Sequence, residues 1–301
     1  MKRHDRNINF VLYFWGKEVK TMKVAIMTDT TSYIPKDIRQ KFNIYTVPLS
    51  VIFGEDSYRE DMDITTEEFY EKVRNAENLP TTSQPAIGEV VDTLEKLSEE
   101  YDAVVTIHLS SKISGTFQAV KSAGEMVESI DVYPFDSSIS AMAQGFYVLE
   151  AAERAEAGDS PEEIIAHLER MKKYVRAYFM VDDLNHLQHG GRLSNAQAII
   201  GSLLKIKPIL HFEDGFIVPF EKIRTKKKAV HRIIGMLEEQ AAQGNVKRVV
   251  FIHANDEPAA IELEKSFIAK YPDVETMISY FGPVIGTHLG EKSLGVSWYT
   301  E

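Results

Sequence analysis

Residues 103–135 read AVVTIHLSSKISGTFQAVKSAGEMVESIDVYPF, and this stretch decides the fold class. Its apolar run at 103–109 predicts a buried strand, and a shorter run at 132–135 predicts another. Residues 115–127 between them have the length and the apolar spacing of a helix. Two strands joined through a helix form a crossover connection, which is typical of a parallel sheet.

The same alternation of strand and helix continues on both sides of this stretch. Further strands are predicted at 23–28 and 44–53, and further helices at 35–41, 65–75, 86–101 and 138–157. Helices that connect parallel strands cover both faces of the sheet. We therefore predict a doubly wound α/β domain with a parallel sheet over residues 22–157.

The pattern changes after a turn at Gly158-Asp159-Ser160-Pro161. Residues 209–218 predict a hairpin through Asp214-Gly215, a dipeptide that favours two-residue turns with positive backbone angles. The other predicted elements are strands at 174–181, 247–253, 274–280 and 294–299, and helices at 225–243 and 258–270. Hairpins mixed with helices predict an α+β domain over residues 158–301.

Residues 1–21 show no periodicity, whereas Met22 begins a clear strand pattern. We expect Met22 to be the functional start and residues 1–21 to be an upstream extension; a short packing arm is the alternative. The apolar stretch 8–15 is less than half as long as a membrane span, and no cleavage site of small residues follows it. Neither an export signal nor a membrane span is predicted.

Composition limits the classes of function. The 301 residues suit two domains, and 34 basic against 45 acidic side chains give a net charge of −11. An acidic chain repels nucleic-acid phosphates and anionic membranes, so neither partner is expected. The absence of cysteine excludes disulfides, thiol nucleophiles and cysteine-ligated metals, and it favours a cytoplasmic protein.

Four hydroxyl-rich loops are the candidate ligand site: 29–32, 81–85, 110–116 and 136–138. In a parallel sheet, ligands lie beyond the carboxyl ends of the strands, where such loops lead into helix N-termini. Free N–H groups and hydroxyls at those positions favour an anion. A carboxylate fits better than a polyphosphate because no glycine-rich phosphate cradle is present. For any single loop, the alternative is that Ser and Thr only cap the helix.

Other chemistries find less support in the sequence. No serine stands in a Gly-x-Ser-x-Gly elbow, which argues against a hydrolase. Asp29 and Asp136 could form a catalytic pair, although accepting hydrogen bonds from loop N–H groups is the simpler role. His186 and His189 lack a third ligand at a recognisable spacing, so no metal site and no cofactor are predicted.

The second half of the chain supplies candidate cationic contacts. Arg192 follows two glycines, which lets its charge approach a ligand or a partner closely. Basic residues at 205–208 and 224–228 form either a solvated face or a docking surface for an acidic partner. The glycine loop 282–290 carries His288, which can donate to a carboxylate in either protonation state. A purely structural histidine is the alternative.

Taken in order, these motifs resemble the DegV family over residues 22–301. They are Thr82-Ser83-Gln84-Pro85, Ser110-Ser111-x-x-Ser114-Gly115-Thr116, Asp136-Ser137, Gly190-Gly191-Arg192, Ile206-Lys207-Pro208-Ile209, Arg224-Thr225-x-x-Lys228-Ala229 and Gly286-x-His288-x-Gly290. The resemblance implies a two-domain α/β protein that holds one long-chain fatty acid in a buried tunnel between the domains. It implies the binding subunit of a bacterial fatty acid kinase and not an enzyme. A separate ATP-dependent kinase subunit would phosphorylate the bound carboxylate, and an acyltransferase would use the acyl phosphate for phospholipid synthesis.

Carried over residue by residue, the resemblance places Thr82 and Ser114 on the carboxylate, with Ser83, Arg192 and His288 around it.

The sequence departs from the family pattern at two places. Glu291-Lys292 stand where Pro-Gly often follows, and Lys226 stands where Arg is frequent. There are two alternative functions: a small-molecule enzyme of the sugar-phosphate type that uses the same crevice, and a purely regulatory module. The lack of an ATP-binding signature argues against a stand-alone kinase.

Overall fold

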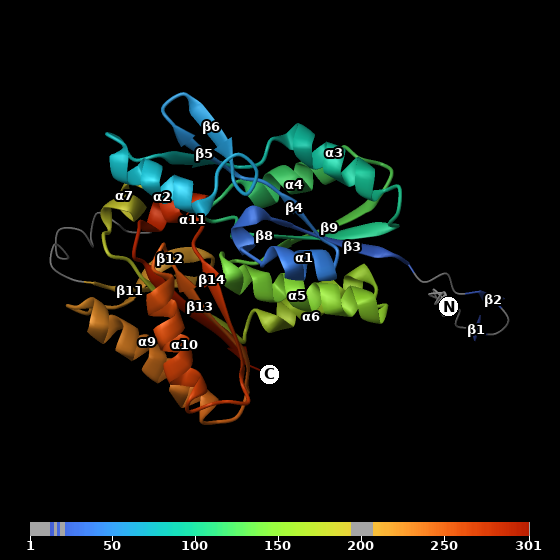
Figure 1. The fold of residues 1–301 in the computed structure, drawn as a ribbon. Helices are drawn as coiled ribbons and strands as arrows, with labels where there is room; N and C mark the ends of the chain where they lie inside the picture. Colours follow the sequence, from blue (N-terminus) through green and yellow to red (C-terminus); the bar gives the residue numbers. More distant parts are fainter. Residues whose placement is uncertain (1–12, 15–16, 19–21, 194–206, 301) are drawn as a thin grey trace, which may run out of the picture.

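A computed structural model describes residues 13–14, 17–18, 22–193 and 207–300 (Figure 1). Its elements form two larger sheets with helices around them and a small three-stranded sheet at the top of the view in Figure 1. Near the N-terminus, β1 (Tyr13–Phe14) pairs with β2 (Lys17–Glu18).

The first large sheet is parallel, in the strand order β4-β3-β8-β9. Its strands are β3 (Val24–Asp29), β4 (Ile44–Val47), β8 (Ala103–His108) and β9 (Asp131–Asp136). One face is covered by α3 (Ile87–Leu97) and α4 (Thr116–Gly124), and the other by α5 (Met142–Ala157) and α6 (Pro161–Met171). The turn η1 (Thr30–Ser32) and the helix α1 (Lys36–Lys41) connect β3 to β4. This arrangement confirms the doubly wound parallel sheet.

The strand predicted at 44–53 is two strands in two different sheets. β4 ends before Pro48, which lacks the N–H needed to continue the ladder. β5 (Ser50–Phe53) then pairs with β6 (Asp56–Arg59) and β7 (Thr81–Ser83) in the small antiparallel sheet. The helix α2 (Thr66–Asn75) begins with a capping box, in which Thr65 and Glu68 exchange hydrogen bonds.

The second large sheet is mixed, in the strand order β12-β11-β10-β15-β13-β14. Its strands are β10 (Val175–Met180), β11 (Ile209–Glu213), β12 (Phe216–Glu221), β13 (Val246–His253), β14 (Glu275–Tyr280) and β15 (Leu294–Thr300). Only β13 and β14 pair in parallel within it. The helices α9 (Lys226–Ala241) and α10 (Glu257–Ile268) pack on one face, which confirms the mixed α+β character.

One predicted loop and one predicted helix differ from the structure. The glycine loop 282–290 is mostly a helix, α11 (Pro283–Leu289), because Pro283 at its first turn fixes a helical backbone angle. The helix predicted from Ser138 starts only at Met142, because Ser138 and Ala141 have positive φ angles of 58° and 57° that interrupt a helix. A further short helix, α7 (Asn185–Gly190), precedes Gly191.

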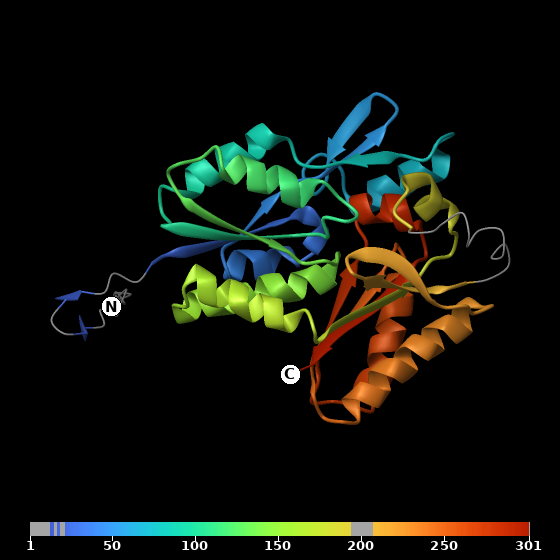
Figure 2. The same ribbon diagram turned by 180° about the vertical axis from the view of Figure 1, so that it is seen from behind.

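Helix α5 lies between the two large sheets and contacts strands of both (Figure 2). Residues 142–152 of this helix are all buried, and Phe146 packs on Tyr299 of β15 with ring centroids 5.2 Å apart. One hydrophobic cluster therefore runs from the first sheet through α5 into the second. The domain boundary at 157 stays a prediction, and α6, which follows it, packs on β8 and β9.

In the part of the chain that the structure describes, no helix has both the length and the apolar character needed to span a bilayer.

Candidate ligand-binding site

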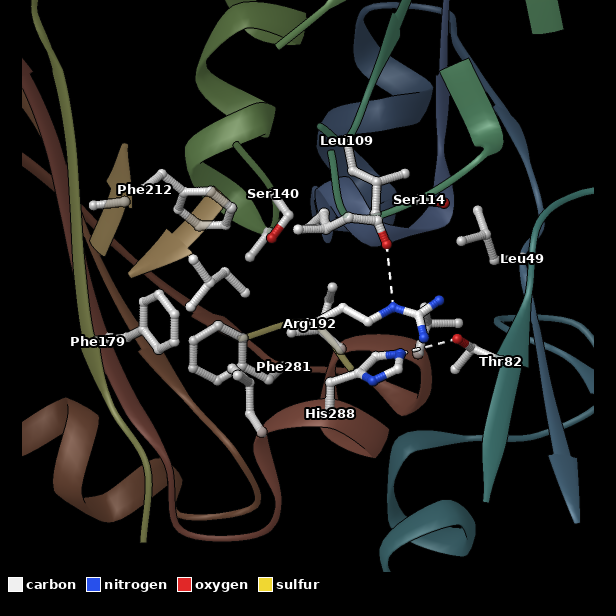
Figure 3. A pocket seen from close by; sticks show the side chains of 18 of the residues that line it. Leu49, Thr82, Leu109, Ser114, Ser140, Phe179, Arg192, Phe212, Phe281 and His288 are labelled. Carbon is white, nitrogen blue, oxygen red and sulfur yellow. Dashed lines mark hydrogen bonds between the residues drawn. The ribbon is translucent and has the colours of Figure 1, made fainter. Parts of the chain in front are cut away.

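A cavity of about 300 Å³ lies between the two halves of the molecule (Figure 3). This volume is at the lower end of the range of about 300–1,000 Å³ that is usual for small-molecule sites. The five predicted ligand residues, Thr82, Ser83, Ser114, Arg192 and His288, all line it. They come from β7, the loop before α4, the segment after α7, and α11, so both halves are needed to build the site.

The wall of the cavity is mostly apolar. Phe179, Phe212 and Phe281 lie together on the side opposite Thr82 (Figure 3), and Leu49, Leu109 and Ile252 add aliphatic surface. Most of the labelled polar side chains lie at the other end, around Arg192 and His288, whereas Ser140 lies near Phe212. A ligand that matches this cavity has one polar end and one long apolar end.

The imidazole of His288 faces Thr82 across the polar end. Thr82 Oγ1 and His288 Nε2 are 2.9 Å apart, which joins β7 to α11. Burial, reinforced by the nearby charge of Arg192, lowers the pKa of His288 to about 3, so its ring is neutral at physiological pH. Nδ1 of His288 is buried and has no hydrogen-bond partner among the described residues.

These contacts decide where the hydrogens lie at the polar end. A buried N–H without an acceptor costs more than a lone pair without a donor, so we assign the single ring proton of His288 to Nε2. Nε2 then donates to Thr82 Oγ1, and the Thr82 hydroxyl hydrogen is available to a ligand. The pair therefore presents an O–H donor to the cavity.

The Ser114 hydroxyl has two roles. It accepts the N–H of Thr116 at 3.2 Å, and its oxygen is 2.9 Å from Thr116 Oγ1. The Ser114 hydroxyl thus accepts from the first residue of α4, whose N-cap position is Gly115, and Ser114 also lines the cavity. When Thr116 Oγ1 donates to it, the Ser114 hydroxyl hydrogen remains for a ligand. Ser83 lines the same end and donates to the carbonyl of Gln84 at 3.3 Å.

Arg192 crosses the polar end from the second half of the chain. Its Nε donates to the carbonyl of Ile113 at 3.2 Å, and NH1 donates to the carbonyl of Gly190. A Cβ on Gly190 would lie 2.2 Å from His288 Nδ1, so only glycine lets this backbone pass so close to the imidazole. The site thus combines the hydroxyls of Thr82 and Ser114 with the positive charge and the further N–H donors of the guanidinium. This set of donors suits a carboxylate.

The structure does not bring every hydroxyl-rich loop to the cavity. Asp29 accepts from Thr31 N at 3.0 Å and from Leu109 N at 3.1 Å, the predicted structural role. Asp136 likewise accepts from Ser111 N and from Ser138 N. The expected convergence of all four loops on a ligand is therefore wrong. Loops 29–32 and 136–138 do not line the cavity, because their aspartates accept N–H groups of their own loops and of residues 109–111.

The remaining candidates lie elsewhere. Lys226 bonds to Asp256 at 3.3 Å and to the carbonyl of Lys292, and it does not line the cavity. Lys205 lies outside the described residues. His186 Nδ1 contacts the carbonyl of Thr287, and the described residues contain no group of three or more side chains arranged to hold a metal ion.

Sequence reasoning missed most of the apolar wall. Ala177 and Phe179 of β10 and Phe212 of β11 line the cavity from strands of the second sheet. The alternation within β10 indicates that residues 177 and 179 share one face. It does not indicate that this face borders a cavity, because that depends on the opposing half of the molecule.

Comparison with known proteins shows the family. A family model described as "Uncharacterised protein, DegV family" matches residues 23–301. The chain belongs to the DegV family. This confirms the resemblance seen in its motifs. Protein DegV of Bacillus subtilis is 58% identical over 278 residues, which cover 92% of this chain and 99% of that protein. A DegV domain-containing protein of Listeria innocua is 52% identical over 92% of this chain and 98% of its own length.

Solved DegV structures share the fold. The crystal structure of DegV from Bacillus subtilis, described as a fatty acid binding protein, has a TM-score of 0.89 and covers 93% of this chain and 100% of that chain. A DegV family protein from Thermus thermophilus, described by its fatty acid binding, is 33% identical with a TM-score of 0.86, over 93% of this chain and 100% of its own.

Proposed function

We propose that this DegV-family chain binds one long-chain fatty acid in the cavity between its halves. The carboxylate lies at Thr82 and Ser114, with Ser83, Arg192 and His288 around it, and the acyl chain lies against the three phenylalanines. The amphipathic lining of the cavity carries this proposal. The fatty acid binding described for the Bacillus subtilis and Thermus thermophilus relatives supports it.

The two ends of the ligand contribute differently to binding. Each methylene moved from water into the apolar wall contributes about 0.8 kcal/mol, so a long chain supplies most of the affinity. The hydroxyl and guanidinium donors hold the carboxylate and fix its orientation. A sugar phosphate would leave the phenylalanine side without a partner, which disfavours the small-molecule enzyme.

We further propose that the chain acts as a carrier and not as an enzyme, and that it presents the carboxylate to a separate ATP-dependent fatty acid kinase subunit. The resulting acyl phosphate passes to an acyltransferase of phospholipid synthesis. The family resemblance supports this role, and the position of Thr82, Arg192 and His288 together at one end of the cavity is compatible with it. Dependence on ATP places the reaction in the cytoplasm.

Purified recombinant protein made in bacteria is expected to contain a fatty acid in a ratio near one to one. The apolar wall buries the chain, so exchange into buffer is slow. Extraction under denaturing conditions followed by mass spectrometry measures the lipid and its stoichiometry. Protein that is folded, lipid-free and unable to take up added fatty acid would contradict the proposed function.

Replacing Arg192 by alanine is expected to lower acyl-phosphate formation more than it lowers fatty acid occupancy. A kinase that carries ATP brings negative phosphates to the polar end, where Arg192 supplies positive charge. The wild-type rate should also fall with salt, because exposed charges are screened within about 10 Å at about 0.1 M. Lys226→Ala is the control, since Lys226 is held by Asp256 away from the cavity lining. Normal phosphorylation by the Arg192 variant at every salt concentration would exclude this role.

A further inference from the structure

The turn of the β11–β12 hairpin touches the loop that carries Ser114. Ser110 is buried and does not line the cavity; its hydroxyl donates to the carbonyl of Gly215, in the hairpin turn, at 2.8 Å. The Lys112 ammonium lies 5.7 Å from the ring centroid of Phe216, the residue after the turn. The hairpin of the second sheet thus holds the β8–α4 loop of the first (Figure 2).

Ser110 also sets the shape of its own loop. Its carbonyl accepts the N–H of Ile113 and the N–H of Ser114, each at 3.1 Å, and its N–H donates to the carbonyl of Ile139 at 2.7 Å. Its Oγ accepts the N–H of Lys112 at 3.2 Å. A displacement of Ser110 therefore moves the backbone of Ser114, whose hydroxyl lines the polar end of the cavity.

The same hairpin reaches Arg192 by a second route. Leu193 forms a parallel bridge with Ile217 of β12, so the residue after Arg192 is fixed to the hairpin. The Nε of Arg192 in turn donates to the carbonyl of Ile113, inside the loop that Ser110 shapes. Ser114 and Arg192 come from different halves of the chain, and contacts with the β11–β12 hairpin therefore fix the position of both.

The fit between turn and loop is close. Gly215 has a φ angle of +82°, and a Cβ there would lie 2.7 Å from Ser110 Oγ and 2.9 Å from Lys112 Cγ. Gly54 occupies the β5–β6 hairpin turn with a φ angle of +61°, and a Cβ there would meet nothing within 4 Å. An alanine at either position is strained, but only at Gly215 does it also push on the Ser114 loop.

We propose that Ser110 and Gly215 are positioning residues that set the geometry of Ser114 and Arg192 for the ligand carboxylate. This inference rests on the proposed function, because it assumes that a carboxylate occupies the polar end. The hairpin turn does not touch the ligand; it acts through the Ser114 loop. Its loss should therefore weaken recognition of the charged head group and spare recognition of the chain.

The test compares palmitate with hexadecanol, which has the same chain length and no charge. Ser110→Ala is expected to lower the affinity for palmitate about tenfold and that for hexadecanol less than twofold, because hydrogen bonds to a charged acceptor are the stronger ones. Gly215→Ala should act in the same direction, and Gly54→Ala should change neither affinity. In a Ser114→Ala background, Ser110→Ala should lower palmitate affinity much less than it does alone.

The outcomes separate the two claims. Equal losses for palmitate and hexadecanol, or full additivity with Ser114→Ala, would assign Ser110 a purely structural role and overturn the inference. Wild-type protein that binds neither probe would overturn the proposed function itself. If Ser110→Ala does not fold, the comparison of Gly215→Ala with Gly54→Ala decides the inference alone.

Discussion

Replacing Glu60 by glutamine is expected to change the free energy of unfolding more favourably at pH 8 than at pH 4, by about 3 kcal/mol. Glu60 is fully buried, and its Oε1 accepts from Tyr33 OH at 2.9 Å and from Val284 N, at the start of α11, at 2.8 Å. Burial raises the pKa of this carboxyl from 4.5 to about 7 despite these two donors. The folded protein therefore keeps the proton to a higher pH than the unfolded chain does.

The direction of the effect follows from this difference. Below pH 4.5 Glu60 is protonated in both states, and its contribution to stability is fully present. Between pH 4.5 and about 7 the unfolded chain releases the proton first, so the wild-type protein loses about 1.4 kcal/mol per pH unit. Glutamine has the same shape and does not titrate, so the variant is spared this loss. Urea unfolding at several pH values measures the difference.

Glu150 offers the same substitution with the opposite expectation. Burial opposes its ionisation, but donors from Tyr299 at 2.5 Å and Lys247 at 3.0 Å outweigh burial and lower the pKa of Glu150. Glu150→Gln should therefore destabilise the protein at pH 7, by about 2 kcal/mol. If the stability of the Glu60→Gln variant relative to wild type did not change between pH 4 and pH 8, the raised pKa of Glu60 would be contradicted.

Replacing Thr82 by valine is expected to weaken fatty acid binding by about tenfold to a hundredfold and to lower the free energy of unfolding of the ligand-free protein by about 1 kcal/mol, because the His288 N–H loses its acceptor. Valine keeps the branched shape that suits β7 and removes only the hydroxyl that pairs with His288 Nε2. A donor to a charged acceptor contributes about 1.5–3 kcal/mol, which corresponds to this loss of affinity. Calorimetric titration with a fatty acid and thermal unfolding without it measure the two effects.

Thr81 provides the control on the same strand. It is exposed and does not line the cavity, so Thr81→Val should leave the affinity unchanged. Ser114→Ala should also lower the affinity, but it removes the acceptor of the Thr116 N–H as well and should cost about 1 kcal/mol of stability. If Thr82→Val lowered the stability of the ligand-free protein and left the affinity unchanged, Thr82 would be a structural residue only.

The sequence predicted those parts of the fold that depend on local pattern. The apolar run at 103–108 forms a strand that is buried on both faces, as an uninterrupted apolar run predicts. The spacing of Thr65 and Glu68 likewise matches the cap at which α2 begins. The prediction failed at Pro48, where one apolar stretch serves two sheets, and a linear pattern carries no sign of the second sheet. The glycines of 282–290 indicated a loop, whereas most of this segment is a helix, in which the close approach of Tyr70 explains the glycine at 286.

The sequence predicted the candidate site only at those motif residues whose side chains line the cavity in the folded protein. Thr82 and His288 are 206 positions apart and meet, as the family resemblance implies. Ser110 looked like a ligand hydroxyl, but its partner is Gly215, 105 positions away in the other half of the chain. The direction of a side chain in a loop depends on such distant contacts, and no spacing within the loop encodes them.

The burial of α5 between the two sheets has a consequence for how the molecule opens and unfolds. Each half completes its interior only with this helix, since Phe146 packs on Tyr299 of one sheet while its neighbours along the helix pack on the other. Neither half can therefore melt alone without exposing the apolar surface of α5 to water. The protein should lose its structure in one cooperative transition, and exchange of a bound molecule should depend on small movements around the cavity and not on a separation of the two halves.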